Sequence, residues 1–347
     1  MNGASALATA PVAAPGLAEQ AVRTAREKAG LHRVGGLLLF LSHHFSRLAQ
    51  PAVLAAARAG DCLQVFGMTT QGLLTEDGWS LDQPAAAALV IGDGLALGHP
   101  VTDHAARLAF TGSPTLPVDW RQTVPRHGLL STSAPVWQQG RLMDDRRSEA
   151  TVLGARCHAA LSAGLQPLTA PLAIDAVHGY DLTRVDGQSA ADSLARALPP
   201  GLRARSPLPL HLLCVERAAG GPGIPLLGAN ADGSLTLAEA LAPGEHIVWS
   251  ARQPLAAERD MADSLEAAAR ACPTPAFALM LSCIGRGPLF YGNDDRDLLA
   301  FRRRFPGLPL LGGYGSGQIH PFAGQCRQYQ NSVVTLLFES AHVQSLP

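Results

Sequence analysis

Two short apolar runs in the last third of the chain each lead into a glycine-rich segment. The run 277–281 precedes residues 282–287, and the run 308–311 precedes residues 312–319. An apolar run of this length is typical of a buried strand, and glycines at its end permit tight turns and close backbone approach. We therefore expect two strand ends whose glycine-rich loops, with polar side chains beside them, line a small pocket.

Strand–helix–strand patterns occur in both halves of the chain. In the first half, strands are predicted at 37–41, 63–66 and 86–91 and helices at 17–29 and 47–59. In the second half, strands are predicted at 277–281 and 308–311 and helices at 255–271 and 294–305. The pattern predicts an α/β (mixed α+β) fold of two related layered halves, with mixed sheets flanked by helices and a pocket between the halves or at strand ends.

Residues 65–72 echo residues 310–317, because each segment is an apolar strand that enters a small-residue loop. The echo suggests duplicated α/β units that face one pocket, and chance similarity between glycine-rich loops is the alternative. Residues 150–161 are predicted to be helical.

The 347 residues suit two domains. Pro199 and Pro200 stop a predicted helix and mark the internal boundary. We expect a disordered Ala- and Pro-rich tail over 1–16, an N-terminal domain over 17–200 and a C-terminal domain over 201–347.

Composition excludes several classes of function. The formal net charge is −1 without a basic stripe, so nucleic acid is not an expected partner. The six cysteines include no C-x-x-C pair, which argues against metal knuckles and a disulfide framework. No apolar run approaches the roughly 18 residues of a membrane span. We expect a cytoplasmic protein that does not contact a membrane.

The order and spacing of several segments resemble the FIST family, a sensory domain made of an N-terminal and a C-terminal part. The resemblance covers roughly residues 34–325, and the matching segments are 39–44, 67–72, 174–177, 185–188, 243–245, 282–287 and 309–319. It implies a non-catalytic domain that binds a small ligand and passes a signal on to a separate protein. Some similar proteins bind haem and sense nitric oxide beside a histidine kinase, and others carry an F-box.

The chain departs from the usual family pattern at three positions. Met68 stands where the first loop usually has Cys, and Leu73 and Gln318 stand where the two loops usually have Glu. If those carboxylates normally fix a ligand amine, this chain does not bind such ligands in the same way. Gln can accept and donate a hydrogen bond, but it carries no charge.

Arg286 is the strongest single candidate for ligand binding, because a planar guanidinium on a glycine-rich loop suits a carboxylate or phosphate. The alternative is a structural Arg that ties down neighbouring groups. Cys283 is either a reactive or ligand-binding thiol or a small buried hydrophobe. Tyr314 either stacks on a flat ligand or closes the core.

The remaining candidates are hydroxyls, glycines and histidines. The expected ligand-binding set is Ser42, His43, Thr69, Thr70, Cys283, Gly285, Arg286, Gly287, Tyr314, Gly315, Gly317 and Gln318. The hydroxyls of Ser42, Thr69 and Thr70 equally suit helix caps. No catalytic residue and no metal ligand are assigned. If haem binds, its ligand is expected to be His43, His44 or His320.

Four functions follow as alternatives. The first is a ligand-sensing module for signal transduction without catalysis. The second is a haem-based nitric oxide sensor that acts with a separate histidine kinase. The third is an enzyme that uses Cys283 with a nearby His, and the fourth is a scaffold whose pocket is vestigial.

Overall fold

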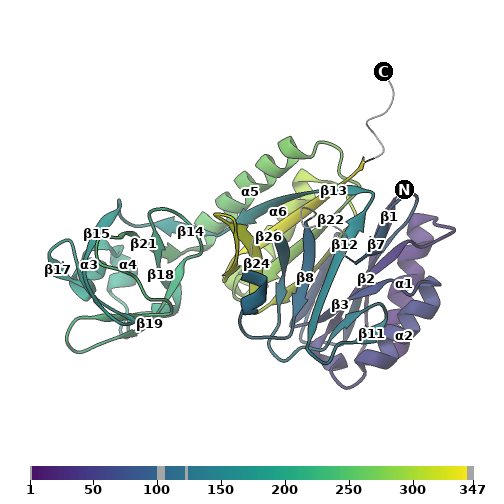
Figure 1. The fold of residues 1–347 in the computed structure, drawn as a ribbon, viewed down its shortest axis with the longest axis horizontal. Coiled ribbons are helices and arrows are strands. Elements are labelled where there is room, and N and C mark those ends of the chain that lie inside the picture. Colours follow the sequence, from purple (N-terminus) through teal and green to yellow (C-terminus); the bar gives the residue numbers. More distant parts are fainter. Residues whose placement is uncertain (1, 100–105, 122–123, 342–347) are drawn as a thin grey trace. The chain divides into compact units, whose positions relative to one another are not determined.

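The computed structural model describes residues 2–99, 106–121 and 124–341, which form two compact units. Residues 1–162 and 261–347 belong to the first, here called the α/β unit, and residues 163–260 form the second, here called the inserted unit (Figure 1). The α/β unit is therefore discontinuous in sequence, and the boundary expected at 200/201 falls within the inserted unit.

Two six-stranded sheets form the centre of the α/β unit. The N-terminal sheet has the order β1 (Gly3–Thr9), β6 (Ala85–Ile91), β2 (Gly36–Ser42), β3 (Val65–Thr70), β10 (Val136–Gln138) and β11 (Arg141–Leu142). The C-terminal sheet has the order β13 (Ala155–Ser162), β26 (Val333–Ser340), β22 (Phe277–Cys283), β23 (Leu310–Gly315), β4 (Gly72–Thr75) and β5 (Gly78–Leu81). Each sheet has one parallel pair at its centre, β2–β3 and β22–β23, with antiparallel neighbours. The mixed, layered α/β prediction is confirmed.

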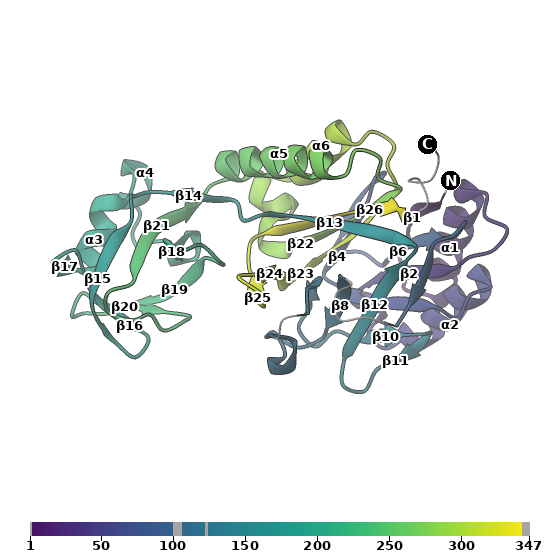
Figure 2. The same cartoon turned by 45° about the horizontal axis from the view of Figure 1, so that its top comes forward.

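Helices cover the outer face of each sheet, and the inner faces meet in one core. Helices α1 (Pro15–Ala29) and α2 (Ala49–Gly60) pack on the N-terminal sheet, as Figure 1 shows. Helix α6 (Arg296–Arg304) and the later residues of α5 (Pro254–Ala271) pack on the C-terminal sheet (Figure 2). Successive residues of a strand point to opposite faces, so Phe40 and Leu279 fill the inner core while Leu39 and Met280 face helices.

A third sheet closes the core of the α/β unit. Its order is β25 (Gln325–Tyr329), β24 (Gly317–Phe322), β9 (Arg126–Leu130), β8 (Arg107–Thr111), β12 (Arg147–Leu153) and β7 (Ala96–Gly98). It too holds a parallel pair, β8–β9. Strands also cross between the halves, since β4 follows β3 in sequence but pairs with β23, and β24 follows β23 but pairs with β9.

Each of the three parallel pairs contains a glycine at the same place. Gly67 is paired with Leu39, Gly312 with Met280 and Gly128 with Ala109. A Cβ added at these glycines would lie 1.9, 2.2 and 1.7 Å from the carbonyl oxygen of the paired residue. The third residue of the second strand must therefore be glycine in all three pairs. Gly67 and Gly312 are also aligned in the sequence echo between 65–72 and 310–317, so the echo reflects two halves of matching strand order.

Two sequence expectations on local structure are wrong. Residues 3–9, expected in a disordered tail, form β1 and pair with β6 from Gly3–Ile91 to Thr9–Ala85. Their alternating alanines are small enough to fit beneath α1, so a composition typical of disorder here serves close packing. Residues 150–161, expected to be helical, are split between β12 and β13. Gly154, with φ of 80°, turns the chain between the two strands.

The inserted unit is an antiparallel β structure around its own core. Its strands are β14 (Leu165–Pro167), β15 (Leu172–His178), β16 (Asp181–Val185), β17 (Gln188–Ser189), β18 (Leu213–Arg217), β19 (Ile224–Ala229), β20 (Leu235–Leu237) and β21 (His246–Arg252). A pairing between β18 and β21 closes the sheet into a ring around Trp249. Helices α3 (Ala190–Ala197) and α4 (Pro200–Arg203) belong to the same unit. Among the described residues, no helix has the length and apolarity that crossing a membrane requires.

The close approach at the parallel pairs can be tested by substitution. We expect Gly67→Ala and Gly312→Ala each to lower the free energy of unfolding by at least about 3 kcal/mol, because the added methyl collides with backbone atoms that cannot move alone. Gly16→Ala is the control, since nothing lies within 4 Å of its Cβ position in α1, and its effect should stay within about 1 kcal/mol. Urea denaturation followed by circular dichroism measures the free energy of unfolding of each variant. If Gly67→Ala and Gly312→Ala were as stable as Gly16→Ala, the backbones would not approach as closely as described.

Candidate functional site

Segments 65–72 and 310–317, which the sequence echo relates, lie side by side in the α/β unit. The amide of Gln71 donates a hydrogen bond to the carbonyl of Tyr314 at 2.9 Å, and Gly72 pairs with Tyr314 in the sheet. Thr70 is buried and its hydroxyl donates to the carbonyl of Gly72 at 2.8 Å. The two segments that the echo relates are therefore neighbours in space.

The second segment is not a loop, as the sequence suggested, but the end of β23 and the start of β24. A Cβ on Gly315 would lie 2.3 Å from the carbonyl oxygen of Leu130, and one on Gly317 would lie 3.1 Å from that of Tyr329. These glycines therefore allow neighbouring strands to approach. Their backbone geometry accounts for them without a ligand.

Arg286 lies in the short 3₁₀ helix η4 (Ile284–Arg286) and is 1% exposed. Its Nε and Nη2 donate to the two carboxylate oxygens of Asp297, each at 3.1 Å. Its Nη1 and Nη2 also donate to the carbonyl and hydroxyl oxygens of Ser162 at 3.0 and 2.7 Å. The guanidinium ties β13 and α6 to the end of β22, which is the structural alternative considered from the sequence.

Two tyrosines complete this buried network. The Tyr291 hydroxyl donates to Asp297 at 2.9 Å, and the Tyr314 hydroxyl donates to Asp295. Asp295 also caps α6 by accepting from the amide of Leu298 at 2.8 Å. Sequence reasoning missed Ser162, Tyr291 and both aspartates, although an Asp directly before a predicted helix is a recognisable cap signal.

One buried cation faces two buried carboxyls in this network. Burial raises the pKa of Asp297 to about 6, because desolvation outweighs the opposing attraction of Arg286 and the charge of Asp295 adds to the rise. Burial likewise raises the pKa of Asp295, against the hydrogen bond from Tyr314. Part of the network is therefore poised to bind a proton in mildly acidic solution.

Gln318 lies on β24 and is fully buried. Its Oε1 accepts a hydrogen bond from the Ser332 hydroxyl at 2.7 Å, and its Nε2 has no hydrogen-bond partner. Turning the amide over exchanges the roles of the two atoms but still leaves one of them unpaired. An unpaired buried amide group costs about 1–3 kcal/mol, so its presence requires an explanation.

A chain of contacts leads from Gln318 to the surface. The amide of Cys283 donates to the carbonyl of Ser332 at 3.1 Å, and Cys283 Sγ lies 3.7 Å from Asn331 Oδ1. A Cβ on the exposed Gly285 would lie 2.2 Å from the same Asn331 oxygen. We call these residues the Gln318 cluster: Cys283, Gly285, Gln318, Asn331 and Ser332. Gly287 lies nearby, against the ring of Tyr314.

The histidines proposed as haem ligands lie in two places. His43 and His44 are exposed in η1 (His43–Phe45), with ring centroids 4.0 Å apart, and His44 Nδ1 lies 3.2 Å from the hydroxyl of the buried Ser42. His320 Nδ1 lies 3.2 Å from Nδ1 of His127, a partner that the sequence analysis missed. Burial lowers the pKa of His320 to about 4 and that of His127 to about 3, so both rings are neutral near pH 7.

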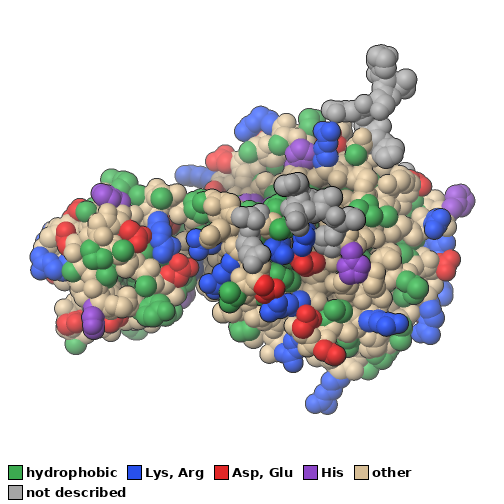
Figure 3. Space-filling model, viewed as in Figure 1, with side chains coloured by type: hydrophobic (Ala, Val, Ile, Leu, Met, Phe, Trp, Pro, Cys, Tyr) green, Lys and Arg blue, Asp and Glu red, His purple; other side chains and the backbone are tan. Residues whose placement is uncertain are grey.

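A cavity of about 330 Å³ lies on the third sheet beside Trp120. The guanidinium carbons of Arg126 and Arg147 are 5.7 and 5.9 Å from the Trp120 ring centroid. Arg126 pairs with Glu149 at 2.6 Å and Arg147 with Asp119 at 2.9 Å. Positive and negative side chains are likewise interspersed on the face drawn in Figure 3. Both arginines beside Trp120 are therefore paired with carboxylates.

A family model matches part of this chain. Residues 190–321 match the family model of the FIST C domain. FIST domains are sensory domains of signal transduction, so the resemblance noted in the sequence is confirmed for the C-terminal part. The match spans much of the inserted unit and the segment of the α/β unit that holds Arg286, Tyr314 and Gln318.

Mycobacterial proteins are similar to this chain. An uncharacterized protein of Mycobacterium bovis, Mb0898c, is 28% identical over 184 residues, which is 50% of this chain and 48% of the relative. The chain thus matches about half the length of that protein and of an equally similar Mycobacterium tuberculosis protein, MT0897. Another uncharacterized M. tuberculosis protein, Rv0628c, is 25% identical over 368 residues, which is 92% of this chain and 94% of the relative.

The buried ion pair predicts a large loss of stability when it is broken. We expect Arg286→Met to lower the free energy of unfolding at pH 7 by about 3–5 kcal/mol, because the carboxyl of Asp297 is left without its cation. The double variant Arg286→Met with Asp297→Leu should recover part of this loss. Arg303→Met, on the exposed side of α6, is the matched control and should change stability by less than about 0.5 kcal/mol. Chemical denaturation of the four proteins decides the matter, and a mild effect at Arg286 would refute a structural role.

The raised pKa of Asp297 predicts how stability depends on pH. The folded chain holds this proton more tightly than the unfolded chain between the ordinary value of 3.8 and about 6. The free energy of unfolding should therefore fall as pH rises through this window, by about 3 kcal/mol at most, and level off above it. Asp297→Asn should remove that part of the slope, while Asp294→Asn, an exposed neighbour, should keep it. Parallel slopes for the wild type and Asp297→Asn would contradict the assignment.

Proposed function

We propose that the protein is a ligand-sensing module of signal transduction that binds a small molecule without catalysing its conversion. The FIST C domain match supports the sensory role. The observation that carries the proposal is the buried amide of Gln318, which has one unpaired atom in a segment that belongs to this domain. A ligand that hydrogen-bonds this amide removes the cost of leaving it unpaired.

Four of the expected ligand-binding residues already have structural roles. Arg286 and Tyr314 are engaged with buried aspartates, and Gly315 and Gly317 are explained by strand packing. The ligand is proposed to enter at the exposed Gly285 and to reach Gln318 past Cys283, with Ser42, His43, Thr69, Thr70 and Gly287 as further candidates. In the orientation described, the amide offers a donor, which suits a ligand carboxylate or carbonyl oxygen.

The signal is proposed to pass to a separate protein, such as a histidine kinase, in a cytoplasmic setting. A second candidate function, a haem-based nitric oxide sensor, is favoured by His320. Its ring is neutral near pH 7, as iron ligation requires, and its Nδ1 lies 3.2 Å from Nδ1 of His127, which would hold the ring in one orientation. Nε2 of His320 would then be the iron ligand.

The test is a thermal-shift screen of the full chain against the common amino acids and small mono- and dicarboxylates. A ligand at about a hundred times its Kd should add about 2.7 kcal/mol to the free energy of unfolding. The double variant Gln318→Leu with Ser332→Ala should keep or raise the basal Tm, because both partners of the hydrogen bond become apolar, and should lose the ligand shift. Gln20→Leu, on an exposed turn of α1, is the control and should keep the shift.

Ferric haem is the second probe in the same experiment. A sharp Soret band that is lost in His320→Ala, but kept in His43→Ala and His44→Ala, would identify the haem sensor instead. A ligand shift that survives in the double variant at 318 and 332 would refute the Gln318 site, and a chain that responds to neither probe would refute both sensing proposals.

A further inference from the structure

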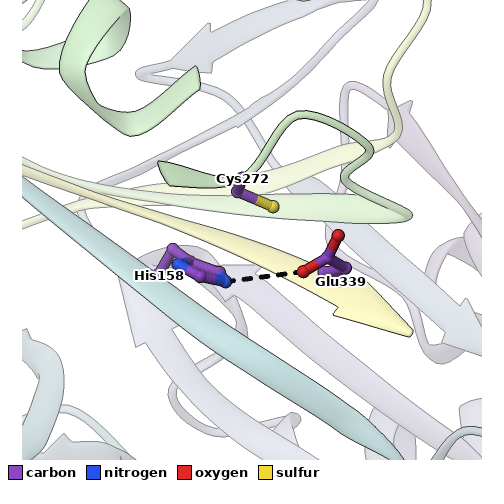
Figure 4. A group of neighbouring side chains, drawn as sticks. All are labelled: His158, Cys272 and Glu339. Atoms are coloured by element: carbon purple, nitrogen blue, oxygen red, sulfur yellow. Dashed lines mark ion pairs between the residues drawn. The ribbon is translucent and has the colours of Figure 1, made fainter. Parts of the chain in front are cut away.

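Three side chains of the kinds that bind zinc converge at the edge of the C-terminal sheet. His158 lies on the edge strand β13, Glu339 lies on its neighbour β26, and Cys272 directly follows α5. One potential ligand atom from each comes within 4.8 Å of the other two. Figure 4 shows the two side chains on the adjacent strands and the sulfur of Cys272 above them. All three residues belong to the α/β unit.

The strand register explains why these side chains meet. His158 pairs with Leu337, and Glu339 is two residues farther along β26, so His158, Leu337 and Glu339 project from the same face of the sheet. Leu337 packs in the same hydrophobic cluster as Cys272, beneath the end of α5. The Cys272 amide donates to the carbonyl of Ala268 at 2.8 Å, which extends the helical hydrogen bonding and fixes the position of the cysteine.

The polar atoms of this group are poorly satisfied by the protein alone. Nε2 of His158 is buried and forms no hydrogen bond, and its ion-pair distance to Glu339 Oε2 is 3.7 Å. Cys272 is fully buried. Glu339 Oε1 accepts from the Thr274 hydroxyl at 3.0 Å, so the carboxylate is held from behind. A buried ring nitrogen without a partner is costly, and a metal ion is a partner that neither neighbour replaces.

We propose that His158, Cys272 and Glu339 bind one Zn²⁺ ion. Imidazole and thiolate favour zinc and its neighbours in the first transition row over Mg²⁺ and Ca²⁺, which prefer oxygen ligands. Tetrahedral zinc with bonds of about 2.0–2.3 Å separates its ligand atoms by roughly 3.2–3.7 Å. Ligand atoms that lie within 4.8 Å of one another reach this spacing by shifts of about 1 Å.

Three protein ligands leave the fourth zinc position open. The side chains of His158 and Glu339 are 28% and 25% exposed, so the site lies close to solvent at the edge of the sheet. The ion would carry an exchangeable water while joining β13, β26 and the end of α5. Thr274 would act as a positioning residue, because it orients the carboxylate without touching the metal.

The experiment uses the full chain stripped of metal with a chelator and then titrated with Zn²⁺ or Co²⁺. Calorimetry should give one Zn²⁺ per chain, and Co²⁺ should give a thiolate-to-metal charge-transfer band. Cys272→Ser should abolish that band, and His158→Gln and Glu339→Gln should each weaken zinc binding at least about tenfold. Thr274→Val, whose side chain is exposed, should weaken binding about tenfold while the protein stays folded. The matched controls are Cys62→Ser and His178→Gln, which are not members of the cluster and should bind zinc as the wild type does.

Circular dichroism shows which variants are folded, and only folded variants are compared. The proposal is overturned if the wild-type chain binds no zinc, if Co²⁺ gives no thiolate band, or if Cys272→Ser binds zinc as tightly as the wild type. It is equally overturned if Thr274→Val and Glu339→Gln are both without effect, since the metal would then bind elsewhere. One zinc per chain, lost in the cluster variants and kept in both controls, supports it.

Discussion

The architecture depends on how closely the backbones approach within three parallel strand pairs. Gly67, Gly128 and Gly312 each occupy the third residue of the second strand, where any side chain would collide with the carbonyl of the paired residue. This approach lets the sheets meet around a single core of large apolar side chains. The same constraint recurs in both halves, which explains why a faint sequence echo corresponds to matching strand order.

The exchange of strands between the halves determines where polar chemistry can occur. Because β4 joins the C-terminal sheet and β24 joins the third sheet, the ends of β3 and β23 are covered by backbone from other parts of the chain. Polar side chains at these ends are therefore buried, and each needs a partner. Tyr314, on β23, donates a hydrogen bond to Asp295, and Arg286, beyond the end of the neighbouring β22, binds Asp297 and Ser162. Gln318 has one hydrogen-bond partner, Ser332, and its Nε2 has none. For this reason Gln318 is a candidate binding residue, whereas Arg286 and Tyr314 belong to a structural network.

Elements with strong apolar runs could be predicted from the sequence, and elements that depend on tertiary context could not. The strands at 37–41 and 277–281 were correctly expected, because an uninterrupted apolar run is typical of a strand buried on both faces. The predictions for residues 3–9 and 150–161 were wrong, because a segment with several alanines can form a tail, a helix or a strand, and its neighbours in the fold decide which. Arg286 was recognised as important, yet its partner Ser162 is 124 residues away in sequence and no local pattern connects them.

The charges around the strand ends determine which side chain can be buried at position 318. A carboxylate there would be fully buried and would need a cation. Arg286 does not provide one, since two of its nitrogens already bind Asp297 and that aspartate has a raised pKa even so. With Glu, the missing cation would have to come from the ligand, which suits an amine. Gln has the same shape without the charge and can also donate a hydrogen bond. Under the proposed function, the ligand is therefore expected to offer an oxygen acceptor rather than a cation.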